Sequence, residues 1–252
     1  MSTFVPSTIA CRCGKRYDVE VANGLHISLR PDLRQKILDG TFHRFFCPAC
    51  GMTTMIDAMI AFTDFPRRQW FTIAPSHGLP WRRTWLELAR ASFQATMVDN
   101  APEMVVGWGR EMTRRLMFGL AALREKLIIA DAGLDDRVVE LMKIQIVRDL
   151  RGELSPSHYF HLVAVRPHER RSREDQDEGG EREALDLSFE RTHPDGLIRE
   201  LVLPRRIYDE LAHQPELEKW IDLAFPDGLL IDHRAMLVPE ADPPAAAATQ
   251  EY

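Results

Sequence analysis

Over the first 75 residues, short runs of alternating apolar and polar positions predict strands separated by turns. Residues 17–22 place Tyr, Val and Val on one side and Asp, Glu and Ala on the other, which is the two-residue period of a strand. Pro31 and Asp32 then open a short helical pattern that ends at Gly40. The run 52–62 predicts another strand.

From Trp85 to Leu150 the spacing of the apolar residues becomes helical. The apolar positions of the first helical stretch are Met112, Leu116, Leu120, Leu123 and Leu127. Residues 131–133 interrupt the pattern, and Asp135 or Asp136 can cap a second helix. The segment therefore predicts a helical hairpin.

Strand alternation returns in the last third of the chain. The predicted strands cover residues 159–166, 184–191, 197–203 and 229–238. Pro204 and Pro215 each open a short helix. Residues 167–183 contain almost no apolar side chain and predict a disordered loop, and the tail 241–252 is expected to be flexible.

The composition is that of an ordinary globular protein, with 45% hydrophobic and 28% charged residues among 252. The N-terminal segment lacks a basic region followed by an apolar run, and no window approaches the roughly 20 apolar residues of a membrane span. We therefore expect a cytoplasmic protein that does not associate with membranes.

Charge is distributed unevenly along the chain. Residues 1–90 hold 12 lysines and arginines against 7 acidic residues, whereas residues 91–252 hold 20 against 31. The positive excess of the first part is too small to indicate a nucleic-acid-binding domain by electrostatics alone.

The four cysteines of the chain form two close pairs, Cys11 with Cys13 and Cys47 with Cys50. In a reducing cytosol, clustered cysteines are more often metal ligands or redox groups than disulfides. Zn²⁺ takes four ligands in a tetrahedron and suits thiolate sulfur. We therefore predict that these four cysteines bind one structural Zn²⁺. A disulfide or free-thiol cluster and an iron site are the alternatives.

The residues beside the cysteines fit this prediction. Gly14 and Gly51 follow the second cysteine of each pair and tolerate the positive φ at which backbone N–H groups fold over the sulfurs. Four thiolates and one Zn²⁺ carry a net charge of −2, which the nearby cations Arg12, Lys15 and Arg16 would offset.

The predicted fold class is α+β. An N-terminal four-cysteine zinc ribbon with a helical insertion occupies residues 1–75, and a C-terminal domain of a helical hairpin and a small antiparallel sheet occupies residues 80–240. The segment 64–81, which is rich in proline and aromatic residues, contains the predicted boundary.

The stretches TIACRCGKRYDVEV and LDGTFHRFFCPACGM, joined by a short helical insertion, resemble the CpXC family of bacterial proteins over roughly residues 7–75. The stretch ALREKLIIADAGLDDRVVELMK is similar to the segment after the cysteine domain in longer members. The resemblance implies a zinc-ribbon-like fold and a metal bound by Cys47 and Cys50, which match the family motif directly, together with Cys11 and Cys13. It implies no reaction.

The first cysteine turn departs from the family, because it is CxC where the family has CxxC. In one interpretation the missing residue is a tolerated deletion, since residues i and i+2 of an extended segment share a face. In the other, CxC followed after about thirty residues by CxxC resembles the zinc centre of redox-regulated chaperones related to heat shock protein 33. Their zinc module is C-terminal, whereas this one is N-terminal; any accessible zinc thiolate can be oxidised.

Three further groups could carry chemistry. Asp131, Asp135, Asp136 and Glu140 could hold Mg²⁺ for a hydrolase, although acidic residues at 135 and 136 also suit a helix start. The segment PWRRTW, residues 80–85, mixes aromatic and basic groups as single-strand nucleic-acid binders do, or packs at a domain junction. His158 and His161 are three apart in a predicted strand and would point to opposite faces.

The sequence contains no nucleophile elbow, phosphate-binding loop or dinucleotide glycine pattern, so nothing in it argues for an enzyme. We expect a binding or adaptor protein whose partner is another protein. A redox-regulated zinc switch or chaperone-like protein, and nucleic-acid binding through the basic face of the ribbon, are the alternatives.

Overall fold

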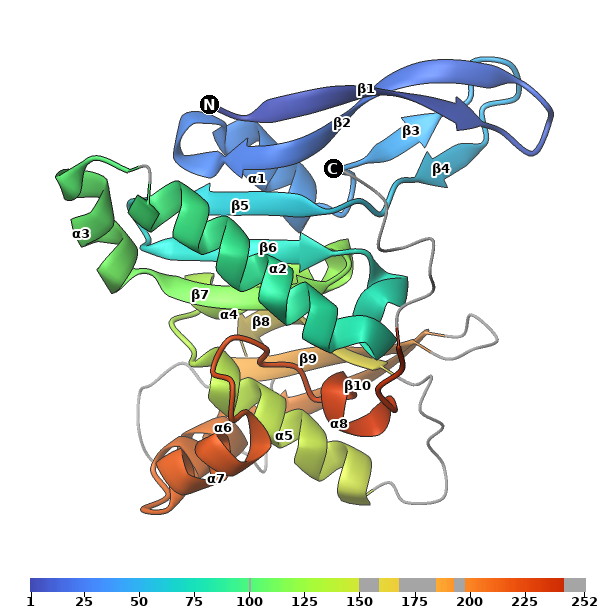
Figure 1. Cartoon of the computed structure of the whole chain (residues 1–252). Helices are drawn as coiled ribbons and strands as arrows, with labels where there is room; N and C mark the ends of the chain where they lie inside the picture. Colours follow the sequence, from blue (N-terminus) through green and yellow to red (C-terminus); the bar gives the residue numbers. More distant parts are fainter. Residues whose placement is uncertain (100, 150–158, 168–184, 193–197, 243–252) are drawn as a thin grey trace. The chain divides into compact units, whose positions relative to one another are not determined.

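A computed structural model describes residues 1–99, 101–149, 159–167, 185–192 and 198–242 of the chain (Figure 1). Contacts divide the chain into two compact units. Unit 1 comprises Met1–Arg124, Asp227–Ile231 and Val238–Tyr252, and unit 2 comprises Glu125–Pro226 and Asp232–Leu237. Most of the predicted loop 167–183 and tail 241–252 lies outside the described residues.

Unit 1 contains a five-stranded sheet in the order β1-β2-β5-β6-β7. Its strands are β1 (Thr3–Ala10), β2 (Arg16–His26), β5 (Ile60–Asp64), β6 (Gln69–Ala74) and β7 (Thr113–Phe118). The pairs β1/β2 and β5/β6 are antiparallel, whereas β2/β5 and β6/β7 are parallel. The alternation at residues 17–22 correctly predicted β2.

A second, two-stranded sheet of unit 1 carries the other pair of cysteines. Strands β3 (Arg44–Phe46) and β4 (Thr53–Met55) pair antiparallel, with Phe46 opposite Thr53. Figure 1 shows this hairpin beside the turn end of the β1–β2 hairpin. The single strand predicted over residues 52–62 is therefore wrong, because the run is divided between β4 and β5, which belong to different sheets.

The helices of unit 1 connect its strands. They are the α-helices α1 (Pro31–Leu38), α2 (Arg82–Gln94) and α3 (Glu103–Glu111), the first part of α4 (Leu120–Asp131), the 3₁₀ helices η1 (Ile27–Leu29) and η2 (Ser76–Trp81), and the π-helical turn η3 (Ala95–Asp99). Helix α1 confirms the prediction at residues 31–40, with Leu33 and Ile37 buried. In α2, Phe93 lies edge-on to Trp70 of β6 with ring centroids 5.6 Å apart, which packs the helix against the sheet.

The helix predicted from Met112 onward is wrong in its first part. Residues 113–118 form β7, and Leu116, Met117 and Phe118 are each about 1% exposed. A continuous buried apolar run is typical of a strand that is covered on both faces. Gly119, with φ +87°, turns the chain from this strand into the following helix, so the apparent helical spacing spans two elements.

The parallel pairing of β6 with β7 also affects the division of the chain. Gln69 of β6 is paired with Thr113 of β7, and Ala74 with Phe118. The chain leaves the five-stranded sheet after β6 and returns to it at β7. Unit 1 therefore continues to Arg124, past the boundary predicted between residues 75 and 80.

Unit 2 combines a helical hairpin with a three-stranded antiparallel sheet in the order β10-β9-β8. Its elements are the second half of α4 (Leu120–Asp131), α5 (Asp136–Asp149), β8 (Tyr159–Pro167), β9 (Leu185–Thr192), β10 (Ile198–Pro204), α6 (Arg205–Ala212), α7 (Leu217–Ala224) and α8 (Arg234–Leu237). The mixture of helices and sheets confirms the predicted α+β class.

The core of unit 2 forms where α5 packs on the sheet. Val138, Val139 and Met142 of α5 join Phe160 and Leu162 of β8 and two residues of β9 in one buried cluster. Burying each such side chain contributes roughly 1.5–3 kcal/mol. This unit therefore has a hydrophobic core of its own.

The last strand predicted, over residues 229–238, is absent, and the short helix α8 occupies residues 234–237. The side chain of Asp232 accepts a hydrogen bond from the backbone N–H of Arg234 at 2.9 Å, which favours a turn over an extended chain. Within the described parts of the chain, none of the helices combines the length and apolar character that a membrane span requires.

Candidate metal centre

Both cysteine pairs lie in turns that join two antiparallel strands. Residues 11–15 connect β1 to β2, and residues 47–52 connect β3 to β4. Strand β1 was not predicted from the sequence, because Pro6 and the polar residues around it do not resemble a strand. Since β1 lies at the edge of its sheet, a proline that lacks an N–H is tolerated there.

The two turns are closed by the same kind of hydrogen bonds. The N–H of Cys11 donates to the carbonyl of Lys15 at 2.8 Å, and the N–H of Gly14 donates to the carbonyl of Cys11 at 2.9 Å. In the second turn, Cys47 donates to Met52 and Gly51 donates to Cys47, both at 2.9 Å. The CxC turn is thus one residue shorter but keeps the closing bonds of the longer one.

Glycine is required after each pair for a conformational reason. Gly14 has φ +87° and Gly51 has φ +71°, a region that residues with a Cβ rarely adopt. The positive φ predicted at both positions is therefore confirmed, and the N–H group of each glycine closes its turn on the carbonyl of the first cysteine.

The four sulfur atoms lie together. The Sγ atoms of Cys11 and Cys50 are 3.6 Å apart, those of Cys13 and Cys47 are 3.7 Å apart, and all four lie within 4.8 Å of one another. A tetrahedron with metal–sulfur bonds of about 2.3 Å has an edge of about 3.8 Å. The cluster could therefore hold a metal ion that prefers four thiolates.

The two thiols of the second turn have pKa values that are shifted in opposite directions. Burial raises the pKa of Cys47, but the N–H groups of Ala49 and Cys50 donate to its sulfur and lower that pKa to about 6. The N–H of Met52 lowers the pKa of Cys50, but the thiols of Cys13 and Cys11 outweigh it and raise that pKa to about 12. The polypeptide alone thus stabilises a thiolate at Cys47, and a divalent cation would deprotonate the others.

His43 ties the second cysteine hairpin to the first. Its side chain is buried, and its Nε2 atom accepts a hydrogen bond from the backbone N–H of Ala22 in β2 at 2.9 Å. Its carbonyl accepts a bond from the N–H of Ile56 at 3.0 Å. This residue, with φ +56°, therefore fixes β3 and β4 next to β2.

We predict that His43 resists protonation. Burial lowers its pKa to about 4, against about 6.5 for an exposed histidine. Because the unfolded chain binds the proton more tightly, His43 contributes stability that is complete above pH 6.5 and is lost as the pH falls towards 4, up to about 3 kcal/mol. NMR titration of the ring should give a pKa near 4, and a value of 6 or above would contradict the burial argument.

Two of the four acidic residues predicted as a possible magnesium site, Asp135 and Asp136, form structural contacts at the start of α5. Asp135 accepts a hydrogen bond from the N–H of Arg137 at 2.9 Å at the start of α5 and pairs with its guanidinium group. Asp136 pairs with Lys126 at 3.1 Å. Among the described residues, neither Asp131 nor these two aspartates belongs to a group of three or more potential ligands. The helix-start interpretation is therefore the better one.

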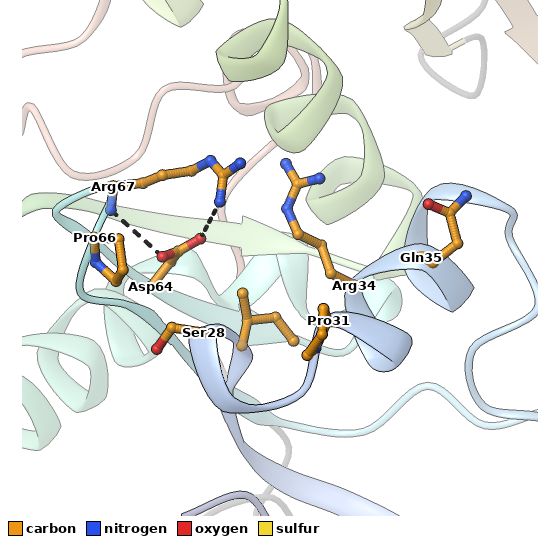
Figure 2. Close-up of a pocket in the computed structure, with 8 residues that line it drawn as sticks. Ser28, Pro31, Arg34, Gln35, Asp64, Pro66 and Arg67 are labelled. Atoms are coloured by element: carbon orange, nitrogen blue, oxygen red, sulfur yellow. Dashed lines mark hydrogen bonds and ion pairs between the residues drawn. The ribbon is translucent and has the colours of Figure 1, made fainter.

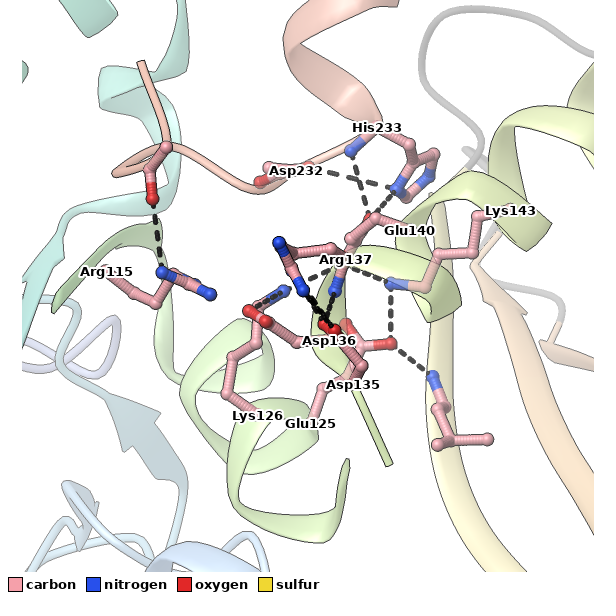
Figure 3. A network of polar contacts seen from close by, with 12 residues as sticks. Arg115, Glu125, Lys126, Asp135, Asp136, Arg137, Glu140, Lys143, Asp232 and His233 are labelled. Carbon is pink, nitrogen blue, oxygen red and sulfur yellow. Dashed lines mark hydrogen bonds and ion pairs between the residues drawn. The ribbon is translucent and has the colours of Figure 1, made fainter. Parts of the chain in front are cut away.

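A second cluster of potential ligands, in unit 2, combines Glu140 of the predicted acidic group with two residues that the sequence did not suggest. Glu140, Asp232 and His233 lie within 4.8 Å of one another, and all are buried (Figure 3). Glu140 accepts hydrogen bonds from the backbone N–H and the Nδ1–H of His233 at 3.0 and 2.9 Å. Besides that acidic group, the sequence signal was the position of Glu140 and Lys143 among the apolar residues that α5 buries.

Buried cations already occupy the carboxylate oxygens of this cluster. Lys126 and Lys143 contact one oxygen of Glu140 at 3.2 and 2.9 Å, and Arg234 pairs with Asp232. Burial raises the pKa of Glu140, but the two ammonium groups hold it well below its usual range. Three positive charges beside the carboxylates disfavour a metal ion, so the cluster is an ion-pair network.

The remaining candidates are also engaged. His161 pairs with the buried Glu125 at 3.2 Å, and His158 lies outside the described residues. In the segment PWRRTW, Trp85 is buried, and Arg82 and Arg83 pair with Glu240. The packing interpretation of this segment is therefore favoured over a nucleic-acid interface.

Comparison with known proteins agrees with the geometry of the cysteine turns. The family model of the CpXC protein matches residues 9–143, which include all four cysteines. No curated protein and no solved structure matches the chain significantly. Because the match covers more than half of the sequence, the chain belongs to the CpXC protein family.

Proposed function

We propose that Cys11, Cys13, Cys47 and Cys50 bind one structural Zn²⁺, and that the resulting zinc ribbon is a docking platform for another protein. The exposure of three large apolar side chains beside the second cysteine turn carries the docking part of this proposal. It implies an adaptor rather than an enzyme.

A structural role for the metal follows from the ligand set. Four cysteine thiolates complete the tetrahedral coordination of Zn²⁺ and leave no position for water or substrate. The backbone supports the same interpretation, since backbone N–H groups of the two turns donate hydrogen bonds to the sulfur atoms of Cys11, Cys47 and Cys50. The metal would hold together two hairpins that His43 also links through its bond to β2.

Three exposed apolar side chains of the β3–β4 hairpin will be called the tip patch, and two of them, Phe46 and Met55, lie on the same face of the hairpin. It consists of Phe46, Met52 and Met55, which are 66%, 44% and 53% exposed. The neighbouring Phe45 and Thr54 are half-buried on the opposite face of the hairpin. Exposed aromatic and methionine side chains are enriched in protein interfaces, so this grouping supports a docking role.

Charge suggests the chemistry of the partner. Arg12, Lys15, Arg16 and Arg44 are all exposed on the same two cysteine hairpins. A partner surface with an apolar centre and an acidic rim would complement both features. We therefore propose an acidic protein surface as the occupant of the tip patch.

We predict that the double substitution Phe46→Ala/Met55→Ala weakens capture of the partner by about tenfold or more, as the loss of central apolar anchors does elsewhere. Affinity purification from the native host, with quantitative mass spectrometry, measures this effect. Leu223→Ala is the matched control, because Leu223 is equally apolar and 83% exposed on α7 of unit 2.

Equal recovery of every protein by the wild type and the double variant would contradict docking at the tip patch. If labelled DNA or RNA is bound instead, with affinity that falls steeply as salt rises, the basic residues act as a nucleic-acid surface. A redox switch is the third candidate, favoured by the exposure of Cys13 and Cys50, and it requires that mild peroxide release the zinc.

A further inference from the structure

Unit 1 contains a pocket that is separate from the cysteine turns (Figure 2). Its volume is about 430 Å³, within the range of small-molecule sites. It lies between η1 and the start of α1 on one side and the β5–β6 turn on the other. The residues that line it include Ser28, Pro31, Arg34, Gln35, Asp64 and Arg67.

A buried carboxylate orients one of the arginines that line the pocket. Asp64 is fully buried at the end of β5, and its Oδ2 atom accepts a hydrogen bond from the guanidinium group of Arg67 at 3.1 Å. Its Oδ1 atom faces the backbone N–H of Arg67 at 3.4 Å. Arg67 is itself about half exposed, so Asp64 orients a guanidinium group that solvent and a ligand can reach.

A second guanidinium group approaches from α1. Figure 2 shows the side chains of Arg34 and Arg67 extending toward one another from opposite sides of the pocket, with Asp64 below the guanidinium group of Arg67. The charged lining residues are two arginines and one aspartate, so the lining carries one net positive charge. Guanidinium groups are planar donors that match the oxygens of a phosphate or a carboxylate.

The rest of the lining limits what else the ligand can contain. Ile27, Pro31 and Pro66 supply apolar surface, while the amide of Gln35 is engaged with Asp39 at 2.8 Å. A lining that combines two guanidinium groups with apolar side chains suits a small molecule with an anionic head and a compact organic body.

We propose that this pocket binds a small oxyanion, a phosphate or carboxylate group carried by an organic molecule, between Arg34 and Arg67. Asp64 acts as the positioning residue that holds Arg67. This site does not depend on zinc binding or on the tip patch, so its failure would leave the proposed function untouched.

Isothermal titration of the full-length protein with inorganic phosphate and, separately, with acetate at constant ionic strength tests the site. We expect saturable binding of at least one of these anions by the wild type, reduced about tenfold or more in Arg34→Ala and in Arg67→Ala. Arg148→Ala is the control, because Arg148 is an exposed arginine of α5 in unit 2. The preferred anion identifies the head group.

Removal of Arg67 leaves Asp64 buried without that guanidinium partner, so Arg67→Ala could unfold the turn. If Arg67→Ala is unfolded, the affinities of Arg34→Ala and Arg34→Lys test the site instead, because Arg34 belongs to α1 rather than to the β5–β6 turn. Lysine keeps the charge but loses the planar donor fork, so it should bind with intermediate affinity. No saturable binding by the wild type, or equal binding by the wild type and Arg34→Ala, would overturn the proposal.

Discussion

Replacing Cys47 by serine should abolish zinc binding and unfold the two cysteine hairpins, while unit 2 stays folded. Cys47 is 2% exposed, and its sulfur lies 3.7 Å from that of Cys13. A serine hydroxyl does not provide the thiolate that the metal requires. Structural zinc contributes roughly 10–16 kcal/mol in zinc-finger peptides, which is comparable with the whole stability of a domain.

Amide NMR spectra and zinc analysis of the purified variant measure both effects. Signals from β1 to β4 should lose their dispersion, whereas signals of core residues such as Val139 and Phe189 in unit 2 should persist. Thr53→Ser is the control, because it also introduces a serine in the second cysteine hairpin but at an exposed position of β4 that provides no sulfur ligand. Unchanged β1–β4 signals after removal of zinc by a chelator would show that the metal is not structural.

Replacing Lys143 by methionine should destabilise unit 2 by about 3–5 kcal/mol. Lys143 is 1% exposed, and its ammonium group lies 2.5 Å from Glu125 and 2.9 Å from Glu140. Without that cation, the buried carboxylates of Glu125 and Glu140 lose the ammonium group that they share. Glu140 keeps its ion pair with Lys126. The cost comes from the uncompensated charges rather than from lost packing, since methionine has a similar length.

Urea unfolding monitored by NMR signals of unit 2 gives this free energy. The double variant Lys143→Met/Glu125→Gln should regain part of the loss, because glutamine removes one charge and keeps the acceptor for the N–H of Leu162. Lys219→Met, at an exposed site of α7, should change stability by no more than about 0.5 kcal/mol. A loss below about 1 kcal/mol in Lys143→Met would mean that water reaches the network.

The cysteine centre could be predicted from sequence because its chemistry is local. Each pair brings its own turn, and Gly14 and Gly51 mark the positions where the backbone reverses. Only the relative placement of the two turns required the structure. The buried contact between His43 and β2 that fixes this placement joins residues 21 positions apart, which no short pattern reveals.

The features that the sequence did not predict depend on contacts between residues that are far apart in the chain. The helical spacing that begins at Met112 continues across residues 113–118, which instead pair with β6 in the sheet. Strand β1 tolerates Pro6 because it is an edge strand. The same holds for the ion-pair network of unit 2 and for the pocket, since Arg34 and Asp64 come from separate elements.

The zinc content of the full-length protein, purified without added metal and measured by mass spectrometry, tests the central claim most directly. We predict one zinc ion per chain, bound with all four cysteines protected from alkylation and lost on replacement of Cys47. A folded protein whose four thiols react freely, or which contains no zinc, would contradict the proposed metal centre.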